Sequence, residues 1–165
     1  MTSALIDQLA TTPKSLAHLV AEASDARLDA TTSGSWSARI VLAHFRDDEY
    51  LCMRVAVERM LAEANPLLHL IDGTDWAAGR NTTRDRKELL LADFALQRQA
   101  SISILRGLRA DDWARAGHTE TRDPFTVEQF VAAWVRHDAE HVAQLEGLLG
   151  ETVAAVIERR SRRPE

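Results

Sequence analysis

The segment His137-Asp138-Ala139-Glu140-His141 lies inside a helical run that extends from Thr126 to Leu149. Two histidines four residues apart lie one above the other on the same face of an α-helix. Apolar side chains mark that face as the inward one, namely Phe130, Val131, Trp134, Leu145 and Leu148. The pattern therefore predicts a helix that points two imidazoles into the protein interior, which is half of a metal site.

A second helical run, from Ser37 to Glu63, carries a third inward-facing histidine. Ser37 suits the N-cap position, and Asn65-Pro66 is expected to end the helix. We expect the inward face to consist of Ile40, Val41, His44, Asp48, Leu51 and Val55. His44 thus shares an apolar stripe with Asp48, which lies one turn further along the helix.

Two further helical runs complete the pattern, from Ser3 to Ser24 and from Asp85 to Leu108, and Pro13 is expected to interrupt the first. No segment alternates apolar and polar residues as a strand does. The long connection from Pro66 to Thr83 carries turn signals and is expected to cover a site. Four long helices joined in this way predict an all-α four-helix bundle.

The end of the chain is expected to differ from the bundle. Thr126 and Gln129 form a capping box that begins the last bundle helix, and Gly150 is expected to end it. A short extra C-terminal helix, from Thr152 to Arg160, then leads into a basic tail at about 159–165. We interpret residues 1–165 as a single domain, because no linker divides the chain.

Composition excludes several classes of function. No run of about 18 apolar residues exists, so we expect no membrane partner. The net charge of −5 argues against a nucleic-acid surface. The single Cys52 excludes an internal disulfide and suits a reducing compartment, so we expect a cytoplasmic protein.

The three inward histidines, His44, His137 and His141, can bind one divalent ion. Zinc or nickel is the leading choice, with iron or manganese as alternatives, because imidazole nitrogens suit such metals. Three protein ligands leave one position open, as catalytic sites do. Asp48 and Glu140 are candidates to orient the imidazoles through their second nitrogen or to take protons. Spacing alone leaves the structural alternative open, in which these histidines are ordinary core residues.

Two other histidines, His69 and His118, lie in predicted loops and are candidate substrate contacts or fourth ligands. The loops around Trp76 and His118 are expected to shape a pocket. Cys52 lies in the middle of a predicted helix beside its inward face, where most cysteines are small core residues.

Two stretches carry a family resemblance. Residues 36–49, WSARIVLAHFRDDE, resemble the W-S-x-x-x-V-L-A-H-L-x-D-x-E pattern that opens the second helix of DinB-like proteins, the DNA-damage-inducible four-helix family. Residues 135–145, VRHDAEHVAQL, resemble the R-H-D-x-x-H-x-x-Q-[LI] segment of that family's last bundle helix. The resemblance spans nearly the whole chain, and Phe45 replaces the common leucine.

The resemblance implies an up-down-down-up bundle, a homodimer, and a divalent metal held by three histidines that match His44, His137 and His141. It implies, as the leading hypothesis, an S-transferase that uses a low-molecular-weight thiol such as bacillithiol, mycothiol or glutathione. A metal-dependent hydrolase is the second hypothesis. The third is a non-enzymatic dimeric stress-response or binding module.

Overall fold

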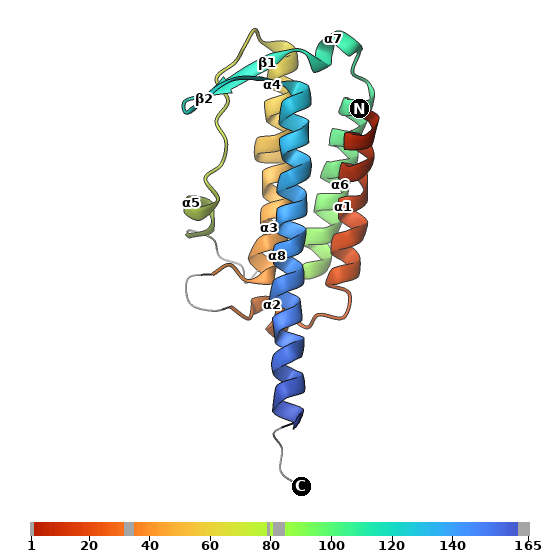
Figure 1. Cartoon of the computed structure of the whole chain (residues 1–165), viewed down its shortest axis with the longest axis vertical. Coiled ribbons are helices and arrows are strands. Elements are labelled where there is room, and N and C mark those ends of the chain that lie inside the picture. The colour runs from red at the N-terminus through yellow and green to blue at the C-terminus, as the bar shows by residue number, and fades with distance from the viewer. Residues whose placement is uncertain (1, 32–34, 79, 81–84, 162–165) are drawn as a thin grey trace.

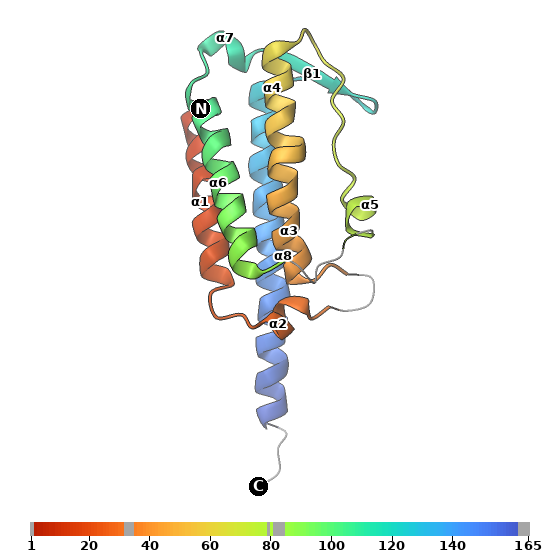
Figure 2. The ribbon, with the colours of Figure 1, turned by 180° about the vertical axis from the view of Figure 1, so that it is seen from behind.

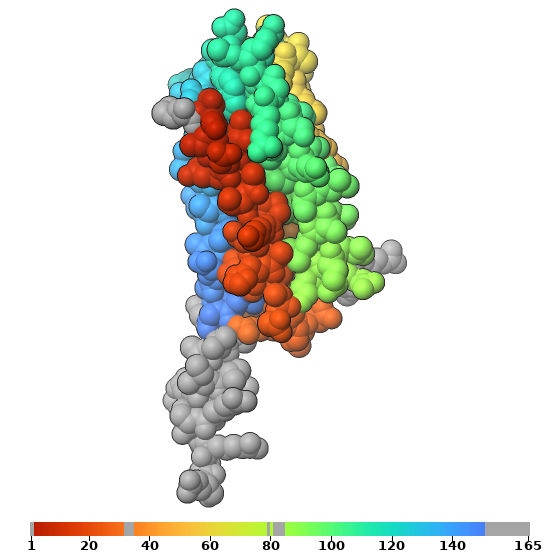
Figure 3. All heavy atoms as spheres, turned by 90° about the vertical axis from the view of Figure 1, so that its right-hand side faces the viewer, coloured from red at the N-terminus to blue at the C-terminus, as the bar shows by residue number. Residues whose placement is uncertain are grey.

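Four long helical segments lie side by side in the computed structural model (Figure 1). They are α1 (Thr2–Leu19), α3 (Ala38–Asp48) with its continuation, α6 (Lys87–Arg106) and α8 (Val127–Ser161). Both α1 and α3 pack against α6 and α8, which closes the bundle. Figure 3 shows α1 and α6 packed along one face. The structure describes residues 2–31, 35–78, 80 and 85–161, and for 151–161 the backbone only.

The bundle has the predicted up-down-down-up topology. In Figure 1, α1 and α8 run downward, whereas α3 and α6 run upward. The connection between the two upward helices must therefore return along the outside of the bundle, and Figure 2 shows it passing beside α3. It contains the short helix α5 (Gly73–Ala78).

The second helix is interrupted by one π-helical turn, which the sequence analysis did not predict. After α3 comes η1 (Glu49–Met53), and then α4 (Arg54–Ala62). A π turn inserts one extra residue, so every later side chain lags by one position around the axis. Leu51 and Val55, predicted to face inward, are 46% and 39% exposed, and Cys52, Ala56, Val57 and Met60 are buried instead.

Pro13 does not interrupt α1, contrary to the prediction. A proline leaves the carbonyl four residues earlier without its helical donor. That carbonyl belongs to Leu9, and the guanidinium of Arg98 donates a hydrogen bond to it at 2.9 Å. Because Leu9 and Leu16 are both buried on either side of the proline, packing also favours a continuous helix.

The loop expected before the last bundle helix contains α7 (Ala110–Trp113) and an antiparallel hairpin of β1 (Ala116–Thr119) and β2 (Arg122–Thr126). A Cβ atom at Gly117 would lie 2.8 Å from Leu68 Cδ1, so the close approach of β1 to the connection requires glycine. Strands this short give no periodic signal, and sequence analysis missed them. The capping box of Thr126 and Gln129 is confirmed by reciprocal hydrogen bonds of 2.8 and 3.2 Å.

The last helix passes through Gly150 and continues to Ser161, so the predicted separate C-terminal helix is wrong. A glycine inside a helix costs only about 1 kcal/mol relative to alanine, and the following residues are mostly good helix formers. Figure 1 shows this end of α8 projecting beyond the bundle. Residues 162–165 of the predicted basic tail lie outside the described part of the chain.

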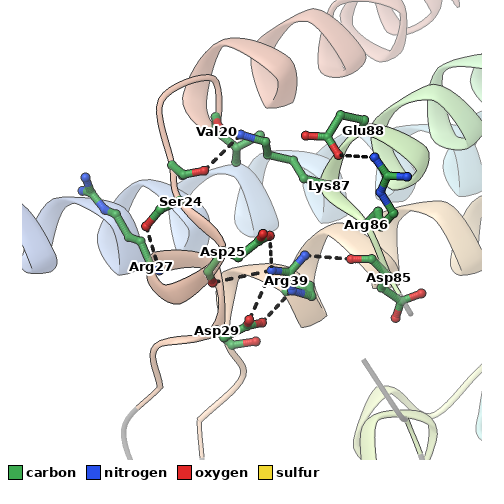
Figure 4. Close-up of polar contacts among 12 residues, drawn as sticks. Val20, Ser24, Asp25, Arg27, Asp29, Arg39, Asp85, Arg86, Lys87 and Glu88 are labelled. Atoms are coloured by element: carbon green, nitrogen blue, oxygen red, sulfur yellow. Dashed lines mark hydrogen bonds and ion pairs between the residues drawn. The ribbon is translucent and has the colours of Figure 1, made fainter. Parts of the chain in front are cut away.

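A buried arginine fixes the start of α3. Figure 4 shows Arg39 between α2 (Asp25–Asp29) and the start of α6. Its guanidinium lies 2.7 Å from the carboxylate of Asp25, 2.6 Å from that of Asp29 and 2.7 Å from the backbone oxygen of Asp85. Lys87 joins the same region by donating to three carbonyls of the turn after α1. The helix that carries His44 is therefore held firmly at its first turns.

Among the described residues, no helix is long and apolar enough to cross a bilayer.

Candidate metal centre

The three predicted histidines converge in the structure. His44 comes from α3, and His137 and His141 come from successive turns of α8. Their ligand nitrogens all lie within 4.8 Å of one another, and Nε2 of His44 is 3.1 Å from Nε2 of His137. A tetrahedral ion at roughly 2.0–2.1 Å from each nitrogen requires separations of about 3.3 Å. Small rotations of the rings therefore bring all three nitrogens onto one ion.

Gln144 sets the orientation of His141. Its Oε1 lies 2.8 Å from Nδ1 of His141. An amide oxygen only accepts, so this contact assigns the proton to Nδ1 and leaves the lone pair on Nε2. The motif of residues 135–145 contains Gln144, but sequence reasoning gave it no role, although its three-residue helical spacing from His141 was a signal for one.

Burial keeps the imidazoles neutral. Desolvation, followed by the neighbouring His137 and His141, lowers the pKa of His44 to about 3. Desolvation also lowers the pKa of His141, although the hydrogen bond with Gln144 acts in the opposite direction. Both rings are therefore neutral at physiological pH, which is the state that binds a metal ion.

Asp48 lies on the metal-facing side of the cluster, not behind it. Its Oδ2 is 3.5 Å from Nε2 of His137, the same nitrogen that approaches His44. The carboxylate is buried, and burial raises its pKa against the opposing effect of His137. The expectation that Asp48 orients an imidazole through its second nitrogen is therefore wrong, and its proton-accepting role stays a prediction.

Glu140 is exposed on α8. No hydrogen bond joins it to the histidines in the part of the chain that the structure describes, and its predicted role finds no support in the geometry. The second nitrogen of His137 is buried without a hydrogen-bond partner among the described residues, and Asp138 Oδ1 is 3.9 Å away.

Two tryptophans enclose the cluster. The ring of Trp36 stacks on His141 at a centroid distance of 5.8 Å and an interplanar angle of 4°. The ring centroid of Trp76, from α5, lies 5.3 Å from that of His44. A Cβ atom at Gly73 would lie 3.1 Å from Trp36, a tight contact, so glycine favours this close approach of α5.

Buried charges tie α5 to α3. Asp47 pairs with Arg80, which also stacks over the ring of Trp76 at 4.7 Å. The indole nitrogen of Trp76 donates to Asp47 at 3.3 Å, and Arg80 contacts Asp85 at 2.9 Å. These contacts hold α5 in place over the histidines. This position agrees with the expectation that the loop around Trp76 helps to shape a pocket.

A buried cluster of charged side chains links the two helices that carry the histidines. Arg98, on α6, lies 2.8 Å from Glu49 at the π turn and 2.6 Å from Asp138, the neighbour of His137. Thr12 donates to Asp138 at 2.6 Å. Burial opposes ionisation of Asp138, but the charge and hydrogen bonds of Arg98 hold its pKa below the usual value. Arg98 thus fixes the spacing between α3 and α8.

A cavity of about 500 Å³ opens beside the histidines. It is lined by residues from the second helix, α8, the connection around residues 70–74 and the hairpin. Cys52 and Met53 reach it from the π turn. Burial, followed by the charge of Asp48, raises the pKa of the Cys52 thiol to about 12, so Cys52 is a neutral wall residue rather than a nucleophile.

The two remaining candidate histidines do not reach the cavity. His69 is exposed. His118 belongs to β1, where its backbone pairs with the connection through hydrogen bonds of 2.7 and 3.0 Å. Neither histidine lines the cavity or belongs to the cluster of three, so the geometry does not support either one as a fourth ligand, and a substrate contact stays a prediction.

The donor set fits a divalent ion. Three imidazoles come from two helices that the buried charges hold at a fixed spacing, and His141 has its lone pair assigned by Gln144. Nitrogen donors of this kind suit zinc, nickel, iron or copper. The identity of the metal is not set by these contacts.

Comparison with known proteins supports a family assignment. The structure is similar to that of YfiT from Bacillus subtilis, with a TM-score of 0.84 and 22% identity, over 92% of this chain and 87% of that one. YfiT is described as a probable metal-dependent hydrolase with an unusual four-helix bundle topology. No curated protein matches the chain. A family model for the DinB superfamily matches residues 8–145, and the chain therefore belongs to the DinB superfamily.

Proposed function

We propose that this protein is a metal-dependent hydrolase whose divalent ion is held by His44, His137 and His141. The convergence of three imidazoles beside an open cavity is the observation that carries the proposal. The description of YfiT as a probable metal-dependent hydrolase supports it.

A divalent ion held by the three histidines would act as a Lewis acid, lowering the pKa of water and polarising the group under attack. The protein supplies the rest. Gln144 holds the proton on Nδ1 of His141, so that Nε2 faces the site. Asp48 places a buried carboxylate oxygen 3.5 Å from Nε2 of His137, where it accepts the proton of an attacking water. Trp36 and Trp76 exclude solvent from one side of the histidines.

The test begins with protein purified without an affinity histidine tag and analysed for bound metal. We expect close to one ion per chain after zinc or nickel is added, and fewer than about 0.2 ions per chain would refute the site. Ester and amide substrates with an apolar body are then screened without any added thiol. Turnover should be lost in His137→Ala and retained in His69→Ala, a matched control because His69 is exposed outside the cavity.

Asp48→Asn separates proton transfer from metal binding. We expect this variant to keep its metal content and to lose turnover by roughly 10²–10⁴-fold, the usual contribution of a general base. Unchanged turnover in Asp48→Asn would remove the carboxylate from the reaction.

The thiol-transferase hypothesis keeps the same three histidines and changes the nucleophile, since an ion also deprotonates a coordinating thiol. The same purified protein is therefore assayed with bacillithiol, mycothiol or glutathione and a generic electrophile. Product that forms only with a thiol would favour the transferase over the hydrolase. If His44→Ala and His141→Ala lower stability while metal and ligands never alter melting, the non-enzymatic module would be favoured. The homodimer stays a prediction, and light scattering of the eluted protein tests it.

A further inference from the structure

We infer that the cavity accepts organic anions with an apolar body, and that Arg122 binds their carboxylate at the end away from the histidines. The inference names a substrate class and so rests on the proposed function for the reaction at the histidine end. Three observations carry it: the chemistry of the cavity walls, the environment of Arg122, and the separation between Arg122 and the histidines.

The walls between the two ends are mostly apolar. They include Met53, Leu70, Ile71, Phe125, Phe130 and Trp134. Cavities of about this size that are lined in this way bind the apolar body of a small molecule and leave orientation to a few polar groups. An aromatic ring with a short aliphatic chain fits both the volume and the walls.

Arg122 is the only lysine or arginine among the described residues that line the cavity. Its guanidinium carbon lies 4.7 Å above the ring of Phe125. Phe125 is itself buried and stacks on Phe130 at 5.9 Å, so the platform beneath the guanidinium is rigid. Stacking on a ring leaves the edge of the guanidinium and its N–H donors free to bind a carboxylate.

Among the residues whose side chains the structure describes, Arg122 has no ion-pair partner. No carboxylate in the described ranges lies within ion-pair distance of Arg122, whereas Arg39, Arg80 and Arg98 each have such partners. The other charged groups of the lining are acidic. Asp48 lies at the histidines, and Asp72 accepts hydrogen bonds from the backbone amides of residues 74 and 75 at the start of α5.

The two ends of the cavity are well separated. His137 lies ten residues after Val127, about 15 Å along the axis of α8 from its first turn. Arg122 belongs to the strand that leads into that first turn. In Figure 1 the hairpin lies above α5 on the same side of the bundle. Residues of both elements line the cavity, Arg122 and Phe125 from the hairpin and Gly73 and Thr74 from α5. A carboxylate on Arg122 therefore leaves the opposite end of an elongated substrate facing the histidines.

Two matched probes test the inference, 4-phenylbutyrate and its neutral amide, 4-phenylbutanamide. Binding is measured by calorimetry and by quenching of tryptophan fluorescence, because Trp36 and Trp134 line the cavity. Each probe is titrated into zinc-loaded protein and into protein treated with EDTA. We expect the acid to bind about tenfold or more tightly than the amide in both forms, as one charge-assisted hydrogen-bonded pair would give.

Arg122→Gln should remove the preference for the acid in both forms, and Arg122→Lys should retain part of it. Arg106→Gln, an exposed arginine on α6, serves as the control and should change nothing. Equal affinity for acid and amide in the unaltered protein, or no binding of either at millimolar concentration, would overturn the inference. So would a preference that survives Arg122→Gln but disappears with EDTA, because the carboxylate would then be on the metal. A protein without hydrolytic activity would still show the Arg122-dependent preference, so the two proposals fail separately.

Discussion

Gln144→Leu should weaken metal binding without unfolding the protein. The change removes the acceptor that lies 2.8 Å from Nδ1 of His141 and replaces it with an apolar group of similar size. His141 then no longer has a partner that favours the tautomer with a free Nε2 lone pair, and its ring is free to rotate. Gln144 is only partly buried, so the substitution creates no large internal cavity.

The size of the effect follows from the contact. A neutral hydrogen bond contributes about 0.5–1.5 kcal/mol net, and 1.4 kcal/mol corresponds to a tenfold change in a dissociation constant. Loss of an outer partner of a ligating histidine commonly weakens metal binding by 10–100-fold. Because this contact is neutral, we expect the lower end, about tenfold. Gln144→Glu should bind at least as tightly as the unaltered protein, since a carboxylate accepts the same hydrogen bond more strongly.

The assay is a competition for zinc with a chromophoric chelator at pH 7.5, and circular dichroism and urea unfolding check the fold. Gln99→Leu, at an exposed position on α6, controls for the loss of a surface glutamine. An unchanged zinc affinity in Gln144→Leu would mean that Gln144 does not orient His141 toward the metal. An equal loss of affinity in the leucine and glutamate variants would point to packing rather than hydrogen bonding.

Two further predictions concern stability. The pKa of His44 is about 3 in the folded protein and near 6.5 when unfolded, so the unfolded chain binds more protons between these values. Metal-free protein should therefore be most stable above about pH 6.5 and should lose stability, approaching 1.4 kcal/mol per pH unit for this group, as the pH falls below that value. Urea titrations at several pH values would show a smaller slope in His44→Phe, and equal slopes would refute the assignment. Arg98→Met leaves Asp138 and Glu49 buried without their cation and should cost about 3–5 kcal/mol in urea unfolding. A loss below 1 kcal/mol would show that Arg98 does not fix the helix spacing.

Local signals in the sequence were sufficient to find the long helices and the three histidines. Ser37 accepts a hydrogen bond from the amide of Ile40, as an N-cap does, and the capping box at Thr126 is formed. His137 and His141 are four residues apart on one helix, so their shared face follows from helical geometry alone. The approach of His44 to them required only that both inward faces meet in one core.

The sequence did not reveal how long-range contacts compensate for local breaks. Pro13 is a helix-breaking signal, yet α1 continues because Arg98, 85 positions later, bonds the carbonyl that the proline leaves unpaired. The hairpin depends on the close approach of Gly117 to Leu68 in a distant segment. None of these contacts produces a pattern within a short window of sequence.

The π turn at Glu49–Met53 shows why the ligands were easier to predict than the cavity. His44 and Asp48 precede the turn, so their positions obey ordinary helical spacing. Residues within and after the turn lag behind ordinary helical spacing, which turns Leu51 and Val55 outward and brings Cys52 and Met53 to the cavity wall. The same turn carries Glu49, whose partner Arg98 also binds Asp138 beside His137. One inserted residue therefore shapes the cavity and joins the two histidine-bearing helices, and it does so where an uninterrupted α-helix would place Leu51 in the core.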